Sequence, residues 1–279
     1  IMPSLVGSED VYKRQGQKGD TYPQQKPLND NAISISMDAQ MLLNGISRSL
    51  FATADDELRP VMNGVYFDIH TDDLTFVASD GHKLVRLRNL AVKSPERASF
   101  ILPKKPANLL KNLLAKESEQ VLIKFDDNNA YITCTNFEMV CRLIEGRYPN
   151  YNSVIPQENP FKVTIDRISF LNALKRVSVF SNPASSLVKL HLKDSLITVS
   201  AQDIDFSTSA EERIVCQFDG TELSIGFKAT YLIEILGNIS SEEVVLELAD
   251  PSRAGLIVPS ENDEDEDLLM LLMPMMLND

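Results

Sequence analysis

The chain has 279 residues, of which 43% are hydrophobic, enough for about two domains that each bury a core. A disordered tail and a minimal disulfide-stapled module are thereby excluded. The 40 acidic and 27 basic residues give a formal charge of −13, which argues against binding nucleic acid through an overall positive potential.

Cysteine usage and hydropathy predict a soluble protein of the cytoplasm. Cys134, Cys141 and Cys216 are odd in number and lack the C-x-x-C spacing, so neither a disulfide framework nor a zinc site is expected. No apolar run approaches the roughly 18 residues of a membrane span, and the start lacks the basic-then-apolar order of a secretory signal. No motif predicts a cofactor.

Residues 1–30 are expected to lie outside the folded domains, because they show neither a helical nor an alternating apolar period. Their opening stretch, SLVGSEDVYKRQ, resembles a translated assembly scar more than native protein. If it is a scar, the native N-terminal part is absent from this sequence.

The first half of the remaining chain, in order, predicts helix, strands, helix, strands. Asp38 is the expected N-cap of a helix that reaches residue 53, and Pro103 is expected to open a second helix over residues 104–115. Apolar runs bounded by turn residues predict the strands 64–69, 74–79, 83–90, 121–125, 130–135 and 138–143.

The second half repeats this order. Helices are predicted over residues 166–180 and 229–237, and strands over residues 187–192, 196–201, 206–214, 244–248, 255–259 and 268–273. The pattern predicts an α+β fold of two tandem domains, residues 31–152 and 153–279, each with two helices on one face and antiparallel sheets outside.

Matching segments support a duplication. Residues 35–51 lie over residues 163–179 with helical spacing in both, LTFVASD lies over ITVSAQD, and VLIKFDD lies over VVLELAD. The leucines of residues 109–113 also lie over the apolar residues of 232–236. Chance similarity of amphipathic segments is the alternative, but the common order and nearly constant offset favour a true repeat.

No arrangement of reactive residues predicts catalysis. His70, His82 and His191 lack metal-ligand spacing, and the chain has no G-x-S-x-G motif or Gly-rich phosphate loop. Cys134 and Cys141 lie in strand-like apolar segments, where a buried inert thiol is usual. An interaction protein is therefore expected, with an enzyme of unrecognised site as an alternative.

Several stretches between or beyond these elements are unusual. SDGHKL (79–84) places a D-G turn before a strand, RPVMNG (59–64) carries Met62, and MLLMPMMLND (270–279) is Met-rich and interrupted by Pro274. A hairpin and core filling are the plain interpretations, yet Met-rich surfaces also suit several apolar partners. The join between the halves, EGRYPNYNSVIP (145–156), has the composition of a linker.

Together RPVMNGVYF, FVASDGHKLVR, EGRYPNY, KLHLKDSLITVSA, IGFKATYL and the terminal LMPM resemble the bacterial DNA polymerase III beta subunit, the replicative sliding clamp. The resemblance runs from about residue 33 to residue 277 and implies tandem DNA-clamp domains. That family has three such domains per chain and forms a head-to-tail dimer around duplex DNA. This chain resembles the second and third domains, and DTYP (20–23) is expected to end the first.

The resemblance implies a hydrophobic pocket between the domains that holds short linear motifs of the replicative polymerase, the clamp loader and repair proteins. Carried over position by position, the pocket residues are Met62, Ser79, Gly81, His82, Lys83, Leu84, Pro149, Ser153, Val154, Leu271, Leu272, Met273, Pro274 and Met275. Ser153 and Met276 stand where basic residues are common in the family, so the charge of the rim departs from the family pattern.

The resemblance also places the predicted helices around the centre of a ring, facing double-stranded DNA. The implied DNA-facing residues are Arg48, Lys104, Lys105, Lys111, Arg167, Lys175, Arg176 and Lys228. Bases outnumber acids on these helices, whereas the remainder, including the run ENDEDED (261–267), is strongly acidic. Contacts to phosphates without base readout would suit sliding. Val179 and Phe180 match the family's subunit-interface positions.

The sequence thus predicts a non-enzymatic processivity clamp, homodimeric in its full-length form, that encircles DNA and tethers its partners. A stand-alone peptide-binding module that never encircles DNA is the other hypothesis.

Overall fold

The computed structural model describes residues 16, 18–21 and 27–277, and the account that follows concerns these residues. The predicted scar, residues 4–15, lies outside them. A single 3₁₀ turn, η1 (Gly19–Thr21), lies in the described part of the leader ahead of the first strand.

The first repeat follows the predicted order of helix and strand. Its helices are α1 (Ala39–Ser49) and α2 (Lys104–Leu114), with 3₁₀ turns η2 (Leu50–Ala52) and η3 (Pro60–Met62). Its strands are β1 (Ile33–Asp38), β2 (Gly64–Ile69), β3 (Leu74–Ser79), β4 (Lys83–Asn89), β5 (Ala98–Pro103), β6 (Gln120–Phe125), β7 (Asn129–Thr133) and β8 (Glu138–Arg142). Asp38 caps α1 as expected, since its side chain accepts a hydrogen bond from the Gln40 amide at 2.8 Å.

The second repeat has its helices and main strands in the same order, with the two-residue strand β13 in addition. Its helices are α3 (Arg167–Val177) and α4 (Ala229–Gly237), and 3₁₀ turns η4 (Tyr151–Val154) and η5 (Ser178–Phe180) precede and follow α3. Its strands are β9 (Phe161–Asp166), β10 (Leu187–Lys193), β11 (Leu196–Asp203), β12 (Thr208–Val215), β13 (Gln217–Phe218), β14 (Leu223–Lys228), β15 (Glu243–Leu248), β16 (Gly255–Pro259) and β17 (Glu266–Leu272).

The order of the strands in the sheets shows that the two repeats have the same fold. The first repeat contributes β1-β6-β7-β8 and β4-β3-β2-β5, and the second contributes β9-β15-β16-β17 and β12-β11-β10-β14 in the equivalent places. The paired strands of these sheets are antiparallel, and each repeat packs its two helices together, α1 with α2 and α3 with α4. The α+β fold with antiparallel sheets is therefore confirmed.

The sequence missed five strands: β13, which has only two residues, and four strands that run directly into a helix. β1, β5, β9 and β14 end at Asp38, Pro103, Asp166 and Lys228, the residues that immediately precede the helices. Because no turn residues separate the strand from the helix, the sequence pattern does not show where one element ends and the other begins. The starts of the helices also correct the expected alignment of residues 109–113 with 232–236. Because α2 starts at Lys104 and α4 at Ala229, the second segment must be moved two positions toward the C-terminus to match the first.

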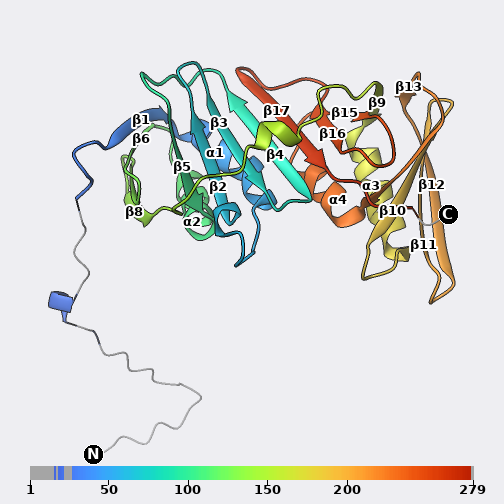
Figure 1. Cartoon of the computed structure of the whole chain (residues 1–279), viewed down its shortest axis with the longest axis horizontal. Helices are drawn as coiled ribbons and strands as arrows, with labels where there is room; N and C mark the ends of the chain where they lie inside the picture. Colours follow the sequence, from blue (N-terminus) through green and yellow to red (C-terminus); the bar gives the residue numbers. More distant parts are fainter. Residues whose placement is uncertain (1–15, 17, 22–26, 278–279) are drawn as a thin grey trace, which may run out of the picture.

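One strand pair joins the two repeats. β17 of the second repeat pairs with β4 of the first, from Glu266 opposite Asn89 to Leu272 opposite Lys83. The pairing merges two sheets into one of nine strands, and Figure 1 shows β17, in red, alongside β4, in cyan. We call this pairing the strand junction. It fixes the relative position of the two halves.

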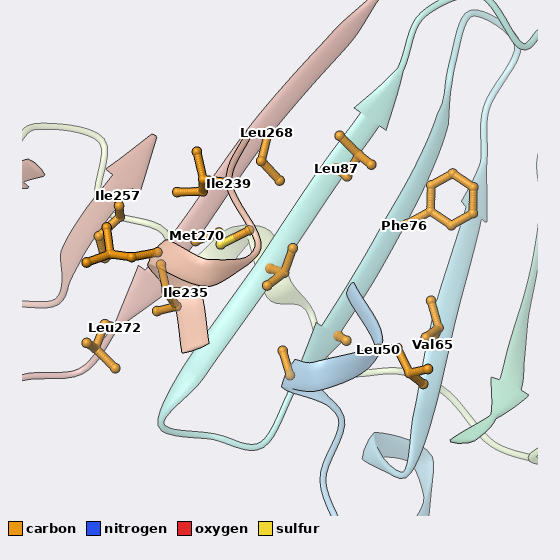
Figure 2. Close-up of a cluster of buried hydrophobic side chains, with 14 of the residues drawn as sticks. Leu50, Val65, Phe76, Leu87, Ile235, Ile239, Ile257, Leu268, Met270 and Leu272 are labelled. Carbon is orange, nitrogen blue, oxygen red and sulfur yellow. The ribbon is translucent and has the colours of Figure 1, made fainter. Parts of the chain in front are cut away.

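The main core runs through the strand junction without a break. Because side chains alternate along a strand, Leu268, Met270 and Leu272 of β17 lie on the face of the sheet that carries Val85 and Leu87 of β4. Figure 2 shows these β17 side chains and Leu87 among the side chains of Leu50, Ile235 and Ile239. The helices of both repeats therefore cover one face of one sheet.

The opposite face of the strand junction is covered by the join between the repeats. We call its packed residues the linker cluster: Val77, Leu84, Ile101, Tyr148, Tyr151, Ile155, Ala254, Leu256, Leu269 and Leu271. Tyr148 stacks on Tyr66 with ring centroids 4.6 Å apart, and the Tyr151 hydroxyl donates to Asp68 at 2.8 Å. The join is thus a structural layer that touches both repeats, and not a loose tether as its composition suggested.

The close packing of α1 on the sheet can be tested by a substitution at Gly45. A Cβ at Gly45 would overlap the ring of fully buried Phe76, so Gly45→Ala should lower the free energy of unfolding by about 1–3 kcal/mol although alanine favours helices. Gly237→Ala in α4 is the matched control, because no atom lies within 4 Å of its Cβ position. Chemical denaturation of both variants measures this, and equal stabilities would contradict the packing described.

Candidate peptide-binding and DNA-facing surfaces

The β3–β4 turn is held in shape by its own polar side chains. Asp80 accepts hydrogen bonds from the amides of His82 and Lys83 at 2.8 and 2.9 Å, and Ser79 donates its hydroxyl proton to the Lys83 carbonyl at 2.8 Å. Gly81 adopts φ +92°, a conformation that glycine accepts readily. The D-G signal therefore marks a hairpin, as the plain interpretation held.

The C-terminal strand brings the second repeat to this turn. At the end of the strand junction Leu271 lies opposite Leu84, and the Met273 amide then donates to the His82 carbonyl at 2.8 Å. Beyond Pro274 the chain pairs Met275 with Gly226 in an isolated bridge. Pro274 thus ends the β4 pairing where the chain turns toward a second sheet.

The predicted pocket residues of the β3–β4 turn and of the C-terminal strand come together here, and the predicted set is unequally accessible. Six of them are buried: Met62, Ser79, Lys83, Leu84, Leu271 and Leu272. The side chains open to a partner are those of His82, Pro149, Ser153, Val154 and Met273, with Pro274 and Met275 half-buried. Val154 and Met273 are 55% and 42% exposed. The buried members support the surface from beneath, and the exposed apolar members present it.

On the helix side of the same turn lies a polar hollow, which we call the junction cavity. It has a volume of about 420 Å³ and is lined by Phe51, Thr53, Ala54, Asp55, Asp56, Arg59, Asp80, His82, Lys83, Lys104, Tyr231 and Glu234. The Lys83 ammonium group lies 2.8 Å from Glu234 and 3.3 Å from Asp80. It also lies 4.1 Å from the Tyr231 ring centroid, a cation–π distance.

Sequence reasoning missed Tyr231 and Glu234. Tyr231 packs against His82, with ring centroids 6.2 Å apart, and lies between the ammonium groups of Lys83 and Lys228. A usable signal was present, because residues 228, 231 and 234 recur every third position and so share one face of α4. That face meets the β3–β4 turn.

Arg48 does not face an open surface, although it was predicted to face DNA. Its side chain is only 13% exposed and forms ion pairs with Asp263 and with Glu266, the latter at 3.1 Å. Asn44 donates to the other Glu266 carboxylate oxygen at 2.6 Å. The acidic run of residues 261–267 therefore packs in part against α1 and links the repeats.

Three of the other predicted DNA-facing residues have partners within the chain. Lys104 pairs with Asp55, Arg176 pairs with Glu212, and Arg167 donates to the carbonyls of Ser241 and Leu236. Lys228 lies over Tyr231, as described.

Lys105, Lys111 and Lys175 form no ion pair with another described residue, and Lys105 and Lys175 are exposed. These two are the most available cations of the predicted set.

The predicted interface positions lie in η5. Val179 is 78% exposed and Phe180 is 40% exposed. Two neighbouring large apolar side chains are thus accessible on this turn.

The thiols of Cys134 and Cys141 have raised pKa values. Burial raises the pKa of the Cys134 and Cys141 thiols to about 11, so both stay protonated at neutral pH. No group of His, Cys, Asp and Glu in the described part of the chain is arranged to hold a metal ion. None of the helices in the described ranges has the length and hydropathy that crossing a membrane needs.

Comparison with known proteins identifies relatives over nearly all of the described chain. Residues 36–150 match the family described as DNA polymerase III beta subunit, central domain, and residues 152–276 match the DNA polymerase III beta subunit, C-terminal domain. The beta sliding clamp of Pseudomonas aeruginosa is 29% identical over 247 residues, which cover 88% of this chain and 66% of that protein. The chain thus spans about two thirds of the length of such relatives.

Solved structures give the same result. The DnaN sliding clamp (DNA polymerase III subunit beta) of Bartonella birtlesii bound to griselimycin has a TM-score of 0.86 and 29% identity, covering 93% of this chain and 70% of that one. The DNA polymerase III beta subunit of Thermotoga maritima has a TM-score of 0.86 and 26% identity, with 94% and 70% coverage.

The buried link at Glu266 predicts a dependence of stability on pH. Burial, with Asp263 nearby, raises the pKa of Glu266 above its ordinary 4.5 despite Arg48 and Asn44. A raised folded-state pKa of an acid stabilises the protein below the ordinary pKa, and this stabilisation is lost as pH rises through the folded value. The unfolding free energy of Glu266→Gln, relative to the wild type, should therefore rise from pH 4 to pH 7. A difference that stays constant or falls would contradict the burial of a charged Glu266.

Proposed function

Because the chain belongs to the family of the DNA polymerase III beta subunit, we propose that it acts as a DNA sliding clamp that confers processivity on a replicative polymerase. The observation that carries this proposal is the match of both repeats, in order, to adjacent domains of the family. Members of the family are processivity factors and not enzymes. The domain bounds proposed here are residues 31–152 and 153–279.

The partner-binding part of the proposal rests on the surface beside the strand junction. His82, Val154 and Met273 come from three segments that are distant in sequence, and Met273 is fixed by its hydrogen bond to His82. A short linear motif with apolar anchors would insert between them, and buried Leu84 and Leu271 beneath would hold the surface in shape. Relatives of this fold have been crystallised with griselimycin, which supports a ligand-binding surface.

The DNA-binding part of the proposal rests on the helices. Lys105 on α2 and Lys175 on α3 are exposed. They would contact phosphates from the layer of helices that covers one face of the sheet. Such contacts carry no sequence information, as a sliding protein requires. In the full-length form we propose a homodimer whose ring encircles double-stranded DNA, with Val179 and Phe180 at the contact between subunits.

Peptide binding can be tested at Met273. Met273→Asp should weaken binding of a Q-L-x-L-F peptide at least about tenfold, because the substitution places a charge where an apolar anchor must be desolvated. Leu90→Asp is the matched control, since Leu90 is also 42% exposed but follows the opposite end of β4. Calorimetric titration measures both affinities. Unchanged affinity for Met273→Asp would refute the site.

DNA binding can be tested at the exposed lysines. Replacing Lys105 and Lys175 together by Gln should weaken duplex binding and reduce the slope of log K against log salt by about 0.9 for each lost phosphate contact. Lys93→Gln is the control, because Lys93 is exposed but lies outside the helices. An unchanged slope in the double variant would contradict the DNA-facing assignment. Equal retention of the full-length form on circular and linear DNA would favour the stand-alone peptide-binding module.

A further inference from the structure

The surface proposed for partners extends past the edge of the sheet onto α4. The linker cluster and the helices cover opposite faces of the sheet at the strand junction. Val154 in η4 lies on the linker side, and Tyr231 in α4 lies on the helix side. His82, in the β3–β4 turn, lies between the two, because its ring packs against Tyr231 and its carbonyl accepts from the Met273 amide. A peptide that binds between Val154 and Met273 therefore has one end toward α4.

Lys228 lies at this end of the surface. It is the last residue of β14 and immediately precedes α4. Because side chains alternate along a strand, Lys228 lies on the same face of β14 as Gly226. A Cβ at Gly226 would lie 2.6 Å from the Met275 carbonyl oxygen, so this face is the one that meets the C-terminal segment. The Lys228 ammonium group lies 4.7 Å from the Tyr231 ring centroid, which holds it beside the partner surface.

Lys228 differs from the neighbouring cation in having no acid partner. Lys83, whose ammonium group also lies over the Tyr231 ring, is paired within the chain. Its partners are Glu234 at 2.8 Å and Asp80 at 3.3 Å. Within the part of the chain that the structure describes, no carboxylate forms an ion pair with Lys228. An aromatic ring attracts a cation but leaves its charge uncompensated. The half-buried Lys228 is therefore open to pairing with a carboxylate that a partner supplies.

We propose that Lys228 selects partner peptides that carry an acidic residue directly outside the apolar motif, at the end that lies toward α4. The inference rests on the proposed function, because it assigns a chemistry to the same peptide-binding surface. The peptide carboxylate accepts from the Lys228 ammonium group, while the apolar anchors stay between His82, Val154 and Met273. A charge pair at the rim of a binding surface contributes to the choice of partner more than to affinity. Lys228, which the sequence predicted to face DNA, is thereby assigned to the peptide.

Peptides that differ in one flanking charge test the proposal. Each has blocked ends and serine at x, and carries either Glu or Gln directly before or directly after Q-L-x-L-F. At one flank the wild type should bind the Glu peptide about two- to fivefold more tightly than its Gln match. At the other flank the two should bind equally, because only one end of the motif lies toward α4. Calorimetric titration measures the four affinities, and raising the salt concentration should reduce the preference.

The variant Lys228→Gln tests whether the preference comes from this residue. Glutamine keeps a polar side chain but lacks the charge, so the variant should bind Glu-flanked and Gln-flanked peptides equally. Lys93→Gln is the matched control, because Lys93 is exposed and follows the end of β4 that is opposite to His82. This control should keep the preference of the wild type.

The possible outcomes separate this inference from the proposed function. Equal affinities of the wild type for Glu-flanked and Gln-flanked peptides would overturn the role of Lys228, while binding of the apolar motif would still support the partner surface. A preference that persists in Lys228→Gln would also overturn that role. So would a reduced salt slope of duplex binding in Lys228→Gln with the peptide preference unchanged, since Lys228 would then contact DNA. If the wild type binds none of the peptides, the partner surface and this inference are both refuted.

Discussion

The pairing of β17 with β4 is the interaction on which the rest of the molecule depends. It connects strands that are some 180 residues apart in the chain and places a continuous apolar core on one face of the sheet and the linker cluster on the other. An isolated two-stranded contact would be marginal in water, but here both faces of the pair are buried. The two repeats consequently form one body. The surface proposed for partners lies at the strand junction, where the two repeats meet.

Ion pairs at the strand junction use up part of the positive charge that the sequence places on and near the helices. The formal charge of −13 and the basic helices suggested an acidic exterior around a basic lining. In the structure Arg48 is instead neutralised by Asp263 and Glu266, and Lys83 by Asp80 and Glu234. Part of the charge on the helices thus joins the repeats, so phosphate contacts are left to fewer lysines than the sequence count implied.

Local patterns predicted local structure well. β2, β3 and β16 have the predicted bounds, because turn residues mark both of their ends. β1 and β5 were missed because each passes into a helix without such a mark. The β4–β17 register could not be derived from periodicity, since any two half-buried strands satisfy the same pattern. For the same reason Tyr231 and Glu234 were missed: their role comes from facing a turn more than 140 residues away.

The central claim is that one surface, built from both repeats at the strand junction, receives the partner peptide. Hydrogen–deuterium exchange with and without a Q-L-x-L-F peptide tests this most directly. The account predicts that the peptide slows exchange at the amides around His82 and around Met273 together, at the same peptide concentration. Protection confined to one repeat, or protection elsewhere on the molecule with both of these segments unchanged, would contradict it.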